Sequence, residues 1–102
     1  MIEVRQTDAY VSWYRRLRDR DARSRILIRI RRLSAGNPGD VRPVGGGVSE
    51  LRIDHGPGYR VYFLQVDQDL AVLLHGGDKS TQRQDIERAR GLARELVKGG
   101  NS

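Results

Sequence analysis

The stretch SELRIDHGPGYRVYF, residues 49–63, combines two strand patterns with a tight turn between them. In residues 49–54, apolar and charged side chains alternate, which is typical of a strand with one buried face. Residues 59–66 follow the Gly-Pro-Gly turn and are apolar on both faces, which favours a central strand. Residues 70–75, LAVLLH, show the same pattern after another short turn. Because both connections are of hairpin length, the sequence predicts a three-stranded antiparallel meander.

Two helices are predicted upstream of this meander, after a short opening strand over residues 2–6. Apolar residues recur at helical spacing in residues 8–20 and again in residues 21–35. Asp8 and Asp21 are the expected N-caps of these helices, since an aspartate side chain accepts an early helical N–H. The two segments are therefore expected to form a helical hairpin.

The remaining segments complete a small α+β domain. Residues 36–47, GNPGDVRPVGGG, are rich in glycine and proline and are expected to form a loop. A last helix is expected to be capped by Ser80 or Thr81, and residues 99–102 are expected to form a frayed tail. The predicted element order is β-α-α-β-β-β-α, in a single domain over residues 1–102.

Positive charge is concentrated in one part of the chain, which has a net charge of +6. Residues 15–32 hold nine arginines against Asp19 and Asp21, a local charge of +7, so the other residues sum to −1. A basic segment of this kind attracts polyanions such as RNA, DNA or an acidic protein. Genomic base composition also enriches arginine, so the charge alone leaves nucleic-acid binding and a merely solvated helix face both open.

Several classes of protein are disfavoured by what the sequence lacks. It has no cysteine, which excludes disulfides, thiolate nucleophiles and zinc–thiolate sites. Its histidines are His55 and His75 alone, so a histidine-built metal site is not expected, and no cofactor is predicted. No apolar run is long enough to span a membrane, and the N-terminus has no apolar signal core. We therefore expect a cytoplasmic protein.

Arg60 begins the strand after the Gly-Pro-Gly turn, where a core-forming strand does not need a guanidinium. One interpretation is an ion pair with Asp54 or Glu50 across the hairpin. The other is a phosphate-binding group that acts with Arg52 and Lys79, because fixed cations stabilise the charge that develops in phosphoryl transfer. Whether Arg52 and Arg60 share a face depends on the turn register, since a slip of one residue reverses it.

Three residues at and after the end of the third meander strand are candidate acid–base groups. Histidine has an ordinary pKa of about 6.5, so His75 could exchange a proton near neutral pH, although a lone histidine at a strand end is more often structural than catalytic. Asp78 and Asp85 are alternative bases, and both also fit roles at a turn and a helix start. The segment GGDKS, residues 76–80, lacks the spacing of a phosphate-binding P-loop, so nucleotide binding is rejected.

Several motifs together resemble toxins of the RelE/ParE superfamily from bacterial toxin–antitoxin modules, and most closely the HigB-like addiction module killer proteins. The resemblance spans nearly the whole chain in the right order. Its motifs are IRIRRL at 28–33, GNPGD at 36–40, GVSELRIDHGPGYRVYF at 47–63 and LLHGGDKSTQRQDIERA at 73–89. The RelE-like fold has two N-terminal helices packed on a twisted antiparallel sheet, with a C-terminal helix, which agrees with the predicted element order.

The resemblance implies a growth-arresting toxin that cleaves mRNA on the translating ribosome without a metal. In this reaction the 2′-hydroxyl of the RNA attacks the adjacent phosphate. A cognate antitoxin would neutralise the toxin, and in HigB-like modules it is usually a HigA-like helix-turn-helix protein that also represses its own operon. DNA would be contacted only through that antitoxin, and no membrane is expected to take part.

The resemblance also implies roles for individual residues. Arg60 matches the arginine that stabilises the charged transition state, and Arg52 and Lys79 match basic residues beside it. RelE-like enzymes often place a tyrosine near the C-terminal helix, and this chain has none there. The candidates for the general base are His75, Asp85 and Asp78. The candidates for contacts to ribosomal RNA are Arg15, Arg16, Arg18, Arg23, Arg25, Arg29, Arg31, Arg32 and Arg83.

Two alternative functions would use the same fold. A ParE-like chain poisons gyrase without ribonuclease chemistry, but such chains generally lack clustered cations like Arg52, Arg60 and Lys79. A decayed toxin would keep only antitoxin binding and regulation of its operon. The sequence favours the mRNA-cleaving toxin over both alternatives.

Overall fold

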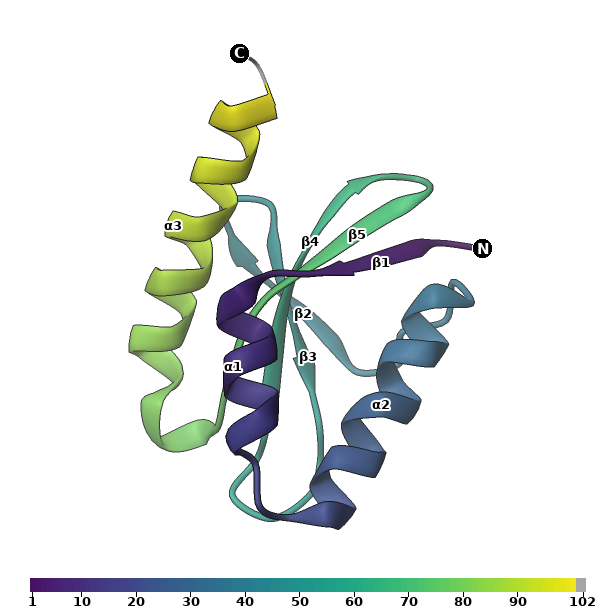
Figure 1. Ribbon diagram of the computed structural model, residues 1–102, viewed down its shortest axis with the longest axis vertical. Coiled ribbons are helices and arrows are strands. Elements are labelled where there is room, and N and C mark those ends of the chain that lie inside the picture. Colours follow the sequence, from purple (N-terminus) through teal and green to yellow (C-terminus); the bar gives the residue numbers. More distant parts are fainter. Residues whose placement is uncertain (101–102) are drawn as a thin grey trace.

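A five-stranded sheet with helices packed on both faces forms the framework of the protein (Figure 1). The computed structural model describes residues 1–100. The elements in chain order are β1 (Glu3–Gln6), α1 (Asp8–Arg16), α2 (Arg20–Ser34), β2 (Val41–Gly45), β3 (Val48–Arg52), β4 (Arg60–Asp67), β5 (Leu70–Gly77), a short 3₁₀ helix (Lys79–Thr81) and α3 (Gln82–Gly100). This arrangement confirms the predicted α+β class and its C-terminal helix.

The sheet has the order β1-β5-β4-β3-β2, in which β1 runs parallel to β5 and every other pair is antiparallel. The predicted meander is present as β3, β4 and β5. Strands β1 and β2 extend it at its two edges. Because β1 pairs with the last strand of the meander, the sheet is mixed and not antiparallel throughout.

Strand β2 corrects the prediction of a loop over residues 36–47. It pairs with β3 across a tight turn in which Gly46 and Gly47 have φ angles of 64° and 79°. Glycine adopts such positive φ angles without the steric cost that other residues meet. Pro43 is tolerated because β2 is an edge strand and its lost N–H leaves no internal partner unpaired. The glycine-rich segment therefore makes an additional hairpin.

Both predicted N-caps are wrong by one or two residues. Thr7, not Asp8, caps α1, and its Oγ1 accepts a backbone N–H at 3.1 Å. Asp19, not Asp21, caps α2 in the same way, also at 3.1 Å. A capping side chain must precede the helix so that it can reach back to the free N–H groups of the first turn, and Asp8 and Asp21 already lie inside that turn. Helix α1 also ends at Arg16, before the predicted boundary at residue 20.

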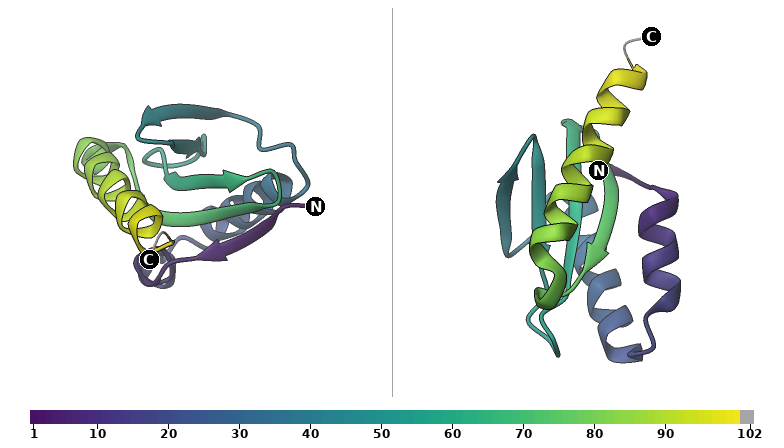
Figure 2. Two further views of the ribbon diagram at one scale, coloured as in Figure 1. Left: turned by 90° about the horizontal axis from the view of Figure 1, so that it is seen from above. Right: turned by 90° about the vertical axis from the view of Figure 1, so that its left-hand side faces the viewer.

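Two hydrophobic cores lie on opposite faces of the sheet. Alternate residues of β4 divide between them: Val61 and Phe63 pack with α1 and α2, whereas Tyr62 and Leu64 pack with α3. Figure 2 shows the α1–α2 pair and α3 as separate layers. The helical residues that complete the cores are Tyr10, Ile26, Ile30 and Leu33 on one side, and Ala89 and Ala93 on the other. Burial on both faces explains why residues 59–66 are apolar at nearly every position.

The C-terminal helix extends further than expected. Helix α3 continues through Gly100, so the first two residues of the predicted frayed tail, 99–102, are helical. Residues 101 and 102 lie outside the described residues. Within residues 1–100, no helix is long and apolar enough to cross a membrane.

Candidate functional site

A cleft of about 440 Å³ opens beside the turn that joins β3 to β4. The three cations that the sequence suggested as a cluster, Arg52, Arg60 and Lys79, all line it. They come from the end of β3, the start of β4 and the 3₁₀ helix that follows β5. The cleft is also lined by Asp40, Ile53, Asp54, Gly56, Pro57 and Gly58.

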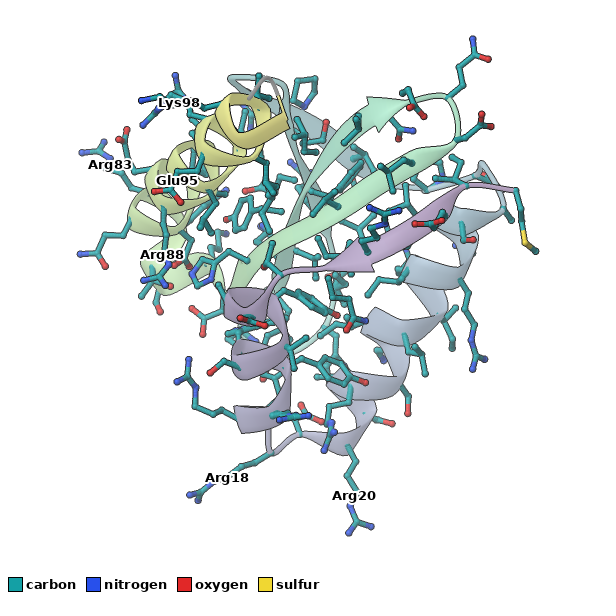
Figure 3. The ribbon with its side chains drawn as sticks, turned by 45° about the horizontal axis from the view of Figure 1, so that its top comes forward. Arg18, Arg20, Arg83, Arg88, Glu95 and Lys98 are labelled. Carbon is teal, nitrogen blue, oxygen red and sulfur yellow. The ribbon has the colours of Figure 1, made fainter. Side chains whose placement is uncertain are left out.

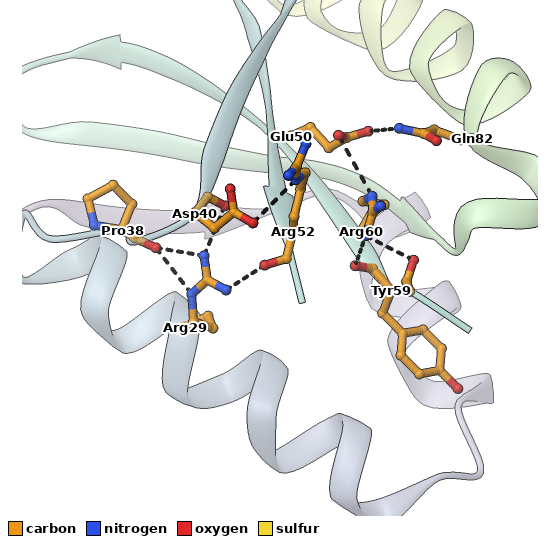
Figure 4. Close-up of polar contacts among 9 residues, drawn as sticks. Arg29, Pro38, Asp40, Glu50, Arg52, Tyr59, Arg60 and Gln82 are labelled. Carbon is orange, nitrogen blue, oxygen red and sulfur yellow. Dashed lines mark hydrogen bonds and ion pairs between the residues drawn. The ribbon is translucent and has the colours of Figure 1, made fainter. Parts of the chain in front are cut away.

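The register of the β3–β4 hairpin answers the question of which face the two arginines share. Arg52 lies directly opposite Arg60, and Glu50 lies directly opposite Tyr62, so all four project from the same face. Like charges in directly opposed positions repel each other. Each arginine is accordingly accompanied by a carboxylate, as Figure 4 shows.

Arg60 is held from several sides (Figure 4). Its Nη1 donates to the backbone carbonyl oxygens of Gly58 and Tyr59, each at 3.2 Å. Its Nε lies 3.7 Å from Oε1 of Glu50 and is buried without a hydrogen-bond acceptor. Among the described residues, its Nη2 has no acceptor either. The predicted ion pair with Glu50 therefore exists, and it leaves one end of the guanidinium free to bind a ligand.

Glu50 is fully buried, at 0% exposure, directly behind Arg60. Its Oε2 accepts hydrogen bonds from the Tyr62 hydroxyl at 3.2 Å and from Nε2 of Gln82 at 2.8 Å. Burial, and next the Glu50 carboxylate, raise the pKa of Tyr62. The sequence suggested Glu50 only as one of two ion-pair partners, because alternation shows which face a residue occupies and not how deeply it is buried.

Arg52 has a more exposed partner. Its Nε donates to Oδ2 of Asp40 at 3.3 Å, and the Asp40 side chain is 58% exposed. Arg29 of α2 links the loop before β2 to the end of β3, because its guanidinium donates to the backbone carbonyl oxygens of Pro38, Asp40 and Arg52. Burial lowers the pKa of Arg29, and the charge of Arg32 adds to this. Arg29, predicted to contact RNA, is therefore engaged in holding the loop before β2.

Lys79 sits at the start of the 3₁₀ helix, against the hairpin turn. Its backbone N–H faces the carbonyl oxygen of Pro57 at 3.4 Å. The side chain is exposed, and within the described residues it makes no ion pair. Asp78 caps the 3₁₀ helix, since its Oδ1 accepts the N–H of Ser80 at 2.8 Å. Ser80 and Thr81, the predicted caps of the last helix, lie in this 3₁₀ helix directly before α3.

His75 and Asp85 form a pair outside the lining of the cleft. Nε2 of His75 lies 3.1 Å from Oδ1 of Asp85, and the Thr81 hydroxyl donates to Oδ2 of Asp85 at 2.6 Å. Burial lowers the pKa of His75, although the hydrogen bond to Asp85 opposes this. Nδ1 of His75 is buried without a partner. A neutral His75 therefore donates from Nε2 to Asp85.

A bulge in β5 turns His75 toward α3. Tyr62 is opposite His75 and Phe63 is opposite Leu73, so Leu74 is the extra residue between them. The extra residue shifts the alternation and brings both Leu74 and His75 to the α3 face. No local sequence signal announces this bulge.

The comparisons with known proteins give the family. Residues 12–97 match the family model described as Phage derived protein Gp49-like (DUF891). The chain belongs to the Gp49-like family. An uncharacterized protein of Haemophilus influenzae (strain ATCC 51907 / DSM 11121 / KW20 / Rd) is 47% identical over 95 residues, which cover 93% of this chain and 96% of that protein. No solved structure matches the chain.

The Gp49-like match covers the whole cleft, because its range includes β3, β4 and the 3₁₀ helix. The Gp49-like family is a family of toxins from toxin–antitoxin addiction modules. The expected toxin class is thus supported at the level of the family. The assignment to the HigB-like branch of the RelE/ParE superfamily stays a prediction.

The arginines predicted to bind RNA differ in this Gp49-like protein: two contact other protein groups, and the others are exposed to solvent. Arg23 stacks over the ring of Tyr14, with 5.0 Å from its guanidinium carbon to the ring centroid, and Arg29 is engaged as described. The others are exposed on α1, α2, the turn between them and the start of α3; they are Arg15, Arg16, Arg18, Arg25, Arg31, Arg32 and Arg83. Figure 3 shows Arg18 pointing into solvent beside the α1–α2 turn, and Arg83 on the separate α3.

His55 lies in the hairpin turn and is partly covered. Its Nε2 is 3.1 Å from Oδ2 of Asp19, the residue that caps α2. The N–H of Ala22, and next the His55 side chain, lower the pKa of Asp19. This contact ties the turn at the cleft to the helical hairpin.

Proposed function

We propose that this Gp49-like protein is the toxin of a toxin–antitoxin pair, and that it arrests growth by cleaving mRNA on the ribosome. The observation that carries the proposal is the convergence of Arg52, Arg60 and Lys79 on one cleft. Several fixed cations around one small cleft suit a phosphate whose negative charge increases during reaction. Membership of a family of addiction-module toxins supports the toxin class.

The proposed chemistry is an attack within the RNA. The 2′-hydroxyl oxygen gives its proton to a general base and bonds to the adjacent phosphorus, while the bond from phosphorus to the 5′-oxygen breaks. The leaving 5′-oxygen takes up a proton from water, so the products are a cyclic phosphate and a free 5′-hydroxyl. Arg60 is the principal ligand of the charge on the phosphate oxygens, through the end of its guanidinium that has no protein acceptor. Arg52 and Lys79 share that charge from the two sides of the cleft. No metal is invoked in this mechanism.

We propose that the general base is one of the predicted candidates, His75, Asp85 or Asp78, although none of them lines the cleft. Of the carboxylates, Asp54 lines the cleft itself, and no ion pair engages it within the described residues. Asp54 therefore joins the three candidates. A base within reach of the 2′-hydroxyl must accept its proton as the new bond forms.

The exposed arginines suit a second task, which is to hold ribosomal RNA. Contacts between arginine and phosphate do not depend on base sequence and weaken as salt is added. The proposed protein partner is a cognate antitoxin, expected to be a helix-turn-helix protein that regulates its own operon. Because the ribosome and the proposed antitoxin are cytoplasmic, we propose that the protein acts in the cytoplasm.

The test is a map of RNA 5′ ends in cells before and after brief induction of the protein, with Arg60→Ala in parallel. We expect new ends inside translated codons, and a loss of about 10²–10³ in cleavage rate for Arg60→Ala. Arg5→Ala is the matched control, because Arg5 is an exposed arginine of β1 that pairs with Glu3 and lies outside the cleft. The control should cleave like the wild type.

Other outcomes assign other functions. Growth arrest without new ends would contradict RNA cleavage and favour the gyrase poison. A folded protein that causes neither arrest nor new ends would be a regulator that only binds its antitoxin. Equal cleavage by Arg60→Ala and the wild type would keep the function and leave Arg60 as a structural ion-pair partner.

A further inference from the structure

Two buried atoms without hydrogen-bond partners face each other behind the cleft. They are Nε of Arg60 and Oε1 of Glu50, and they lie 3.7 Å apart. Buried polar groups in native proteins are nearly always paired, so an unpaired donor opposite an unpaired acceptor of opposite charge is not accidental packing. A small shift of either side chain would close this gap to a hydrogen bond.

Of the two groups, Glu50 is the fixed one. Its Oε2 is held by the Tyr62 hydroxyl and the Gln82 amide, so three elements, β3, β4 and α3, converge on one carboxylate. The Glu50 side chain is 0% exposed. Arg60, at 12% side-chain exposure, sits between this carboxylate and the cleft.

The second arginine–carboxylate pair of the cleft is built differently. Asp40, the partner of Arg52, is 58% exposed and lies on the loop before β2. An exposed ion pair contributes little and can exchange for an incoming phosphate, whereas a buried one cannot be released without leaving an unpaired charge. We therefore expect the Glu50 carboxylate to affect the cleavage rate and the Asp40 carboxylate to affect the binding of phosphate.

We propose that Glu50 is a positioning residue for Arg60, in the RNA-cleaving reaction put forward above, on which this inference rests. The Glu50 carboxylate lies 3.7 Å from Nε as an ion-pair partner, and the carbonyl oxygens of Gly58 and Tyr59 accept from Nη1. The guanidinium is thereby turned so that Nη2 is left for the substrate phosphate. The negative charge of Glu50 opposes the charge that develops on the phosphate. Glu50 therefore contributes by orienting Arg60, and this orientation speeds the cleavage step without strengthening RNA binding.

The test compares three variants that each remove one negative charge: Glu50→Gln, Asp40→Asn and Asp69→Asn. Cleavage is measured as single-turnover kcat on an mRNA bound to ribosomes, and binding as Kd for the same ribosome–mRNA complex with a 2′-deoxy sugar at the cleavage position. For Glu50→Gln we expect kcat to fall by about tenfold or more while Kd is no weaker than in the wild type. Asp40→Asn is expected to act on Kd, by tightening it. Asp69→Asn, at the exposed tip of the β4–β5 hairpin, should change neither quantity.

Two results would overturn the proposal. One is a Glu50→Gln protein whose kcat equals that of the wild type. The other is a Glu50→Gln protein that changes Kd and kcat in the same way as Asp40→Asn, because that would mean that only its charge matters. Where Glu50→Gln fails to fold, Gln82→Ala takes its place, since it keeps the charge and removes only one hydrogen bond to Oε2. An unchanged kcat in folded Gln82→Ala would then count against the proposal.

A separate measurement keeps this inference distinct from the proposed function. The Nε–H signal of Arg60 in an NMR spectrum, assigned by its loss in Arg60→Lys, reports whether Glu50 shields that group from exchange with water. We expect slow exchange in the wild type and faster exchange in Glu50→Gln. A wild-type protein that cleaves no RNA but shows this difference would refute the function and retain the Glu50–Arg60 contact, whereas equal exchange would refute the contact itself.

Discussion

At the scale of single residues, the three cations of the cleft differ in how deeply their carboxylate partners are buried. Arg60 has a carboxylate that is fully buried, Arg52 has one that is largely exposed, and Lys79 has none among the described residues. The three cations could be suggested from the sequence. The depth of Glu50 could not, because a strand pattern specifies a face, and depth depends on what packs above that face.

His75 gives a prediction about stability and pH. Burial holds its pKa below the ordinary value of about 6.5, so the unfolded chain binds this proton more readily than the folded one. The contribution of a neutral His75 to stability is therefore fully present above that ordinary value and is lost as the pH falls from it through the lower pKa of the folded protein. Urea unfolding between about pH 5 and pH 8 should show a steeper loss of stability in the wild type than in His75→Gln. Parallel curves for the two proteins would contradict the prediction.

At the scale of elements, the end of β5 is fitted between helices. A Cβ atom on Gly76 would lie 2.1 Å from the Trp13 ring of α1, and one on Gly77 would lie 1.9 Å from Oδ2 of Asp85 in α3. The glycines of this segment therefore serve close packing on both faces of the strand. The sequence suggested a turn here, because glycine pairs are common in turns and the helices that approach them are remote in the chain.

This fit predicts that Gly77→Ala destabilises the protein by about 1–3 kcal/mol, because the new methyl group displaces Asp85 and with it the bond to His75. Gly91→Ala is the matched control in α3. Its added Cβ would meet only an Arg94 nitrogen, at 3.7 Å, so it should stabilise the helix by about 0.5–1 kcal/mol. Denaturant midpoints for the two variants would test this, and a neutral Gly77→Ala would contradict it.

At the scale of the whole molecule, the exposed arginines and the cleft lie on different parts of the fold. The exposed arginines lie mainly on the α1–α2 hairpin, whereas the cleft is built from the sheet and the 3₁₀ helix. The contact between His55 and Asp19 joins the two parts at the hairpin turn. In the proposed function, the helices would hold ribosomal RNA while a phosphate of the mRNA enters the cleft.

The salt dependence of RNA binding tests this division. The slope of log Kd against log salt should fall by about 0.7 for each phosphate contact that is lost. We expect Arg18→Ala combined with Arg25→Ala to reduce the slope and weaken Kd without a change in the bound single-turnover kcat. Arg5→Ala should leave the slope unchanged, and an unchanged slope in the double variant would exclude those two arginines from the RNA contact.

The sequence by itself determined the three helices, the β3–β4–β5 meander, the α+β class and the hairpin that carries Arg52 and Arg60, because these follow from local periodicity, turn chemistry and short connections. It misplaced both helix caps by a residue or two, since several polar residues near a helix start compete for that role. Only the tertiary structure decided the pairing of β1 with β5, the extra strand β2, the bulge at Leu74 and the burial of Glu50. The pairing of β1 with β5 and the cover of Glu50 by Gln82 join segments far apart in the chain, which no local pattern encodes. Strand β2 and the bulge lie in hairpins of neighbouring strands, where glycine, proline and alternation patterns did not specify the pairing.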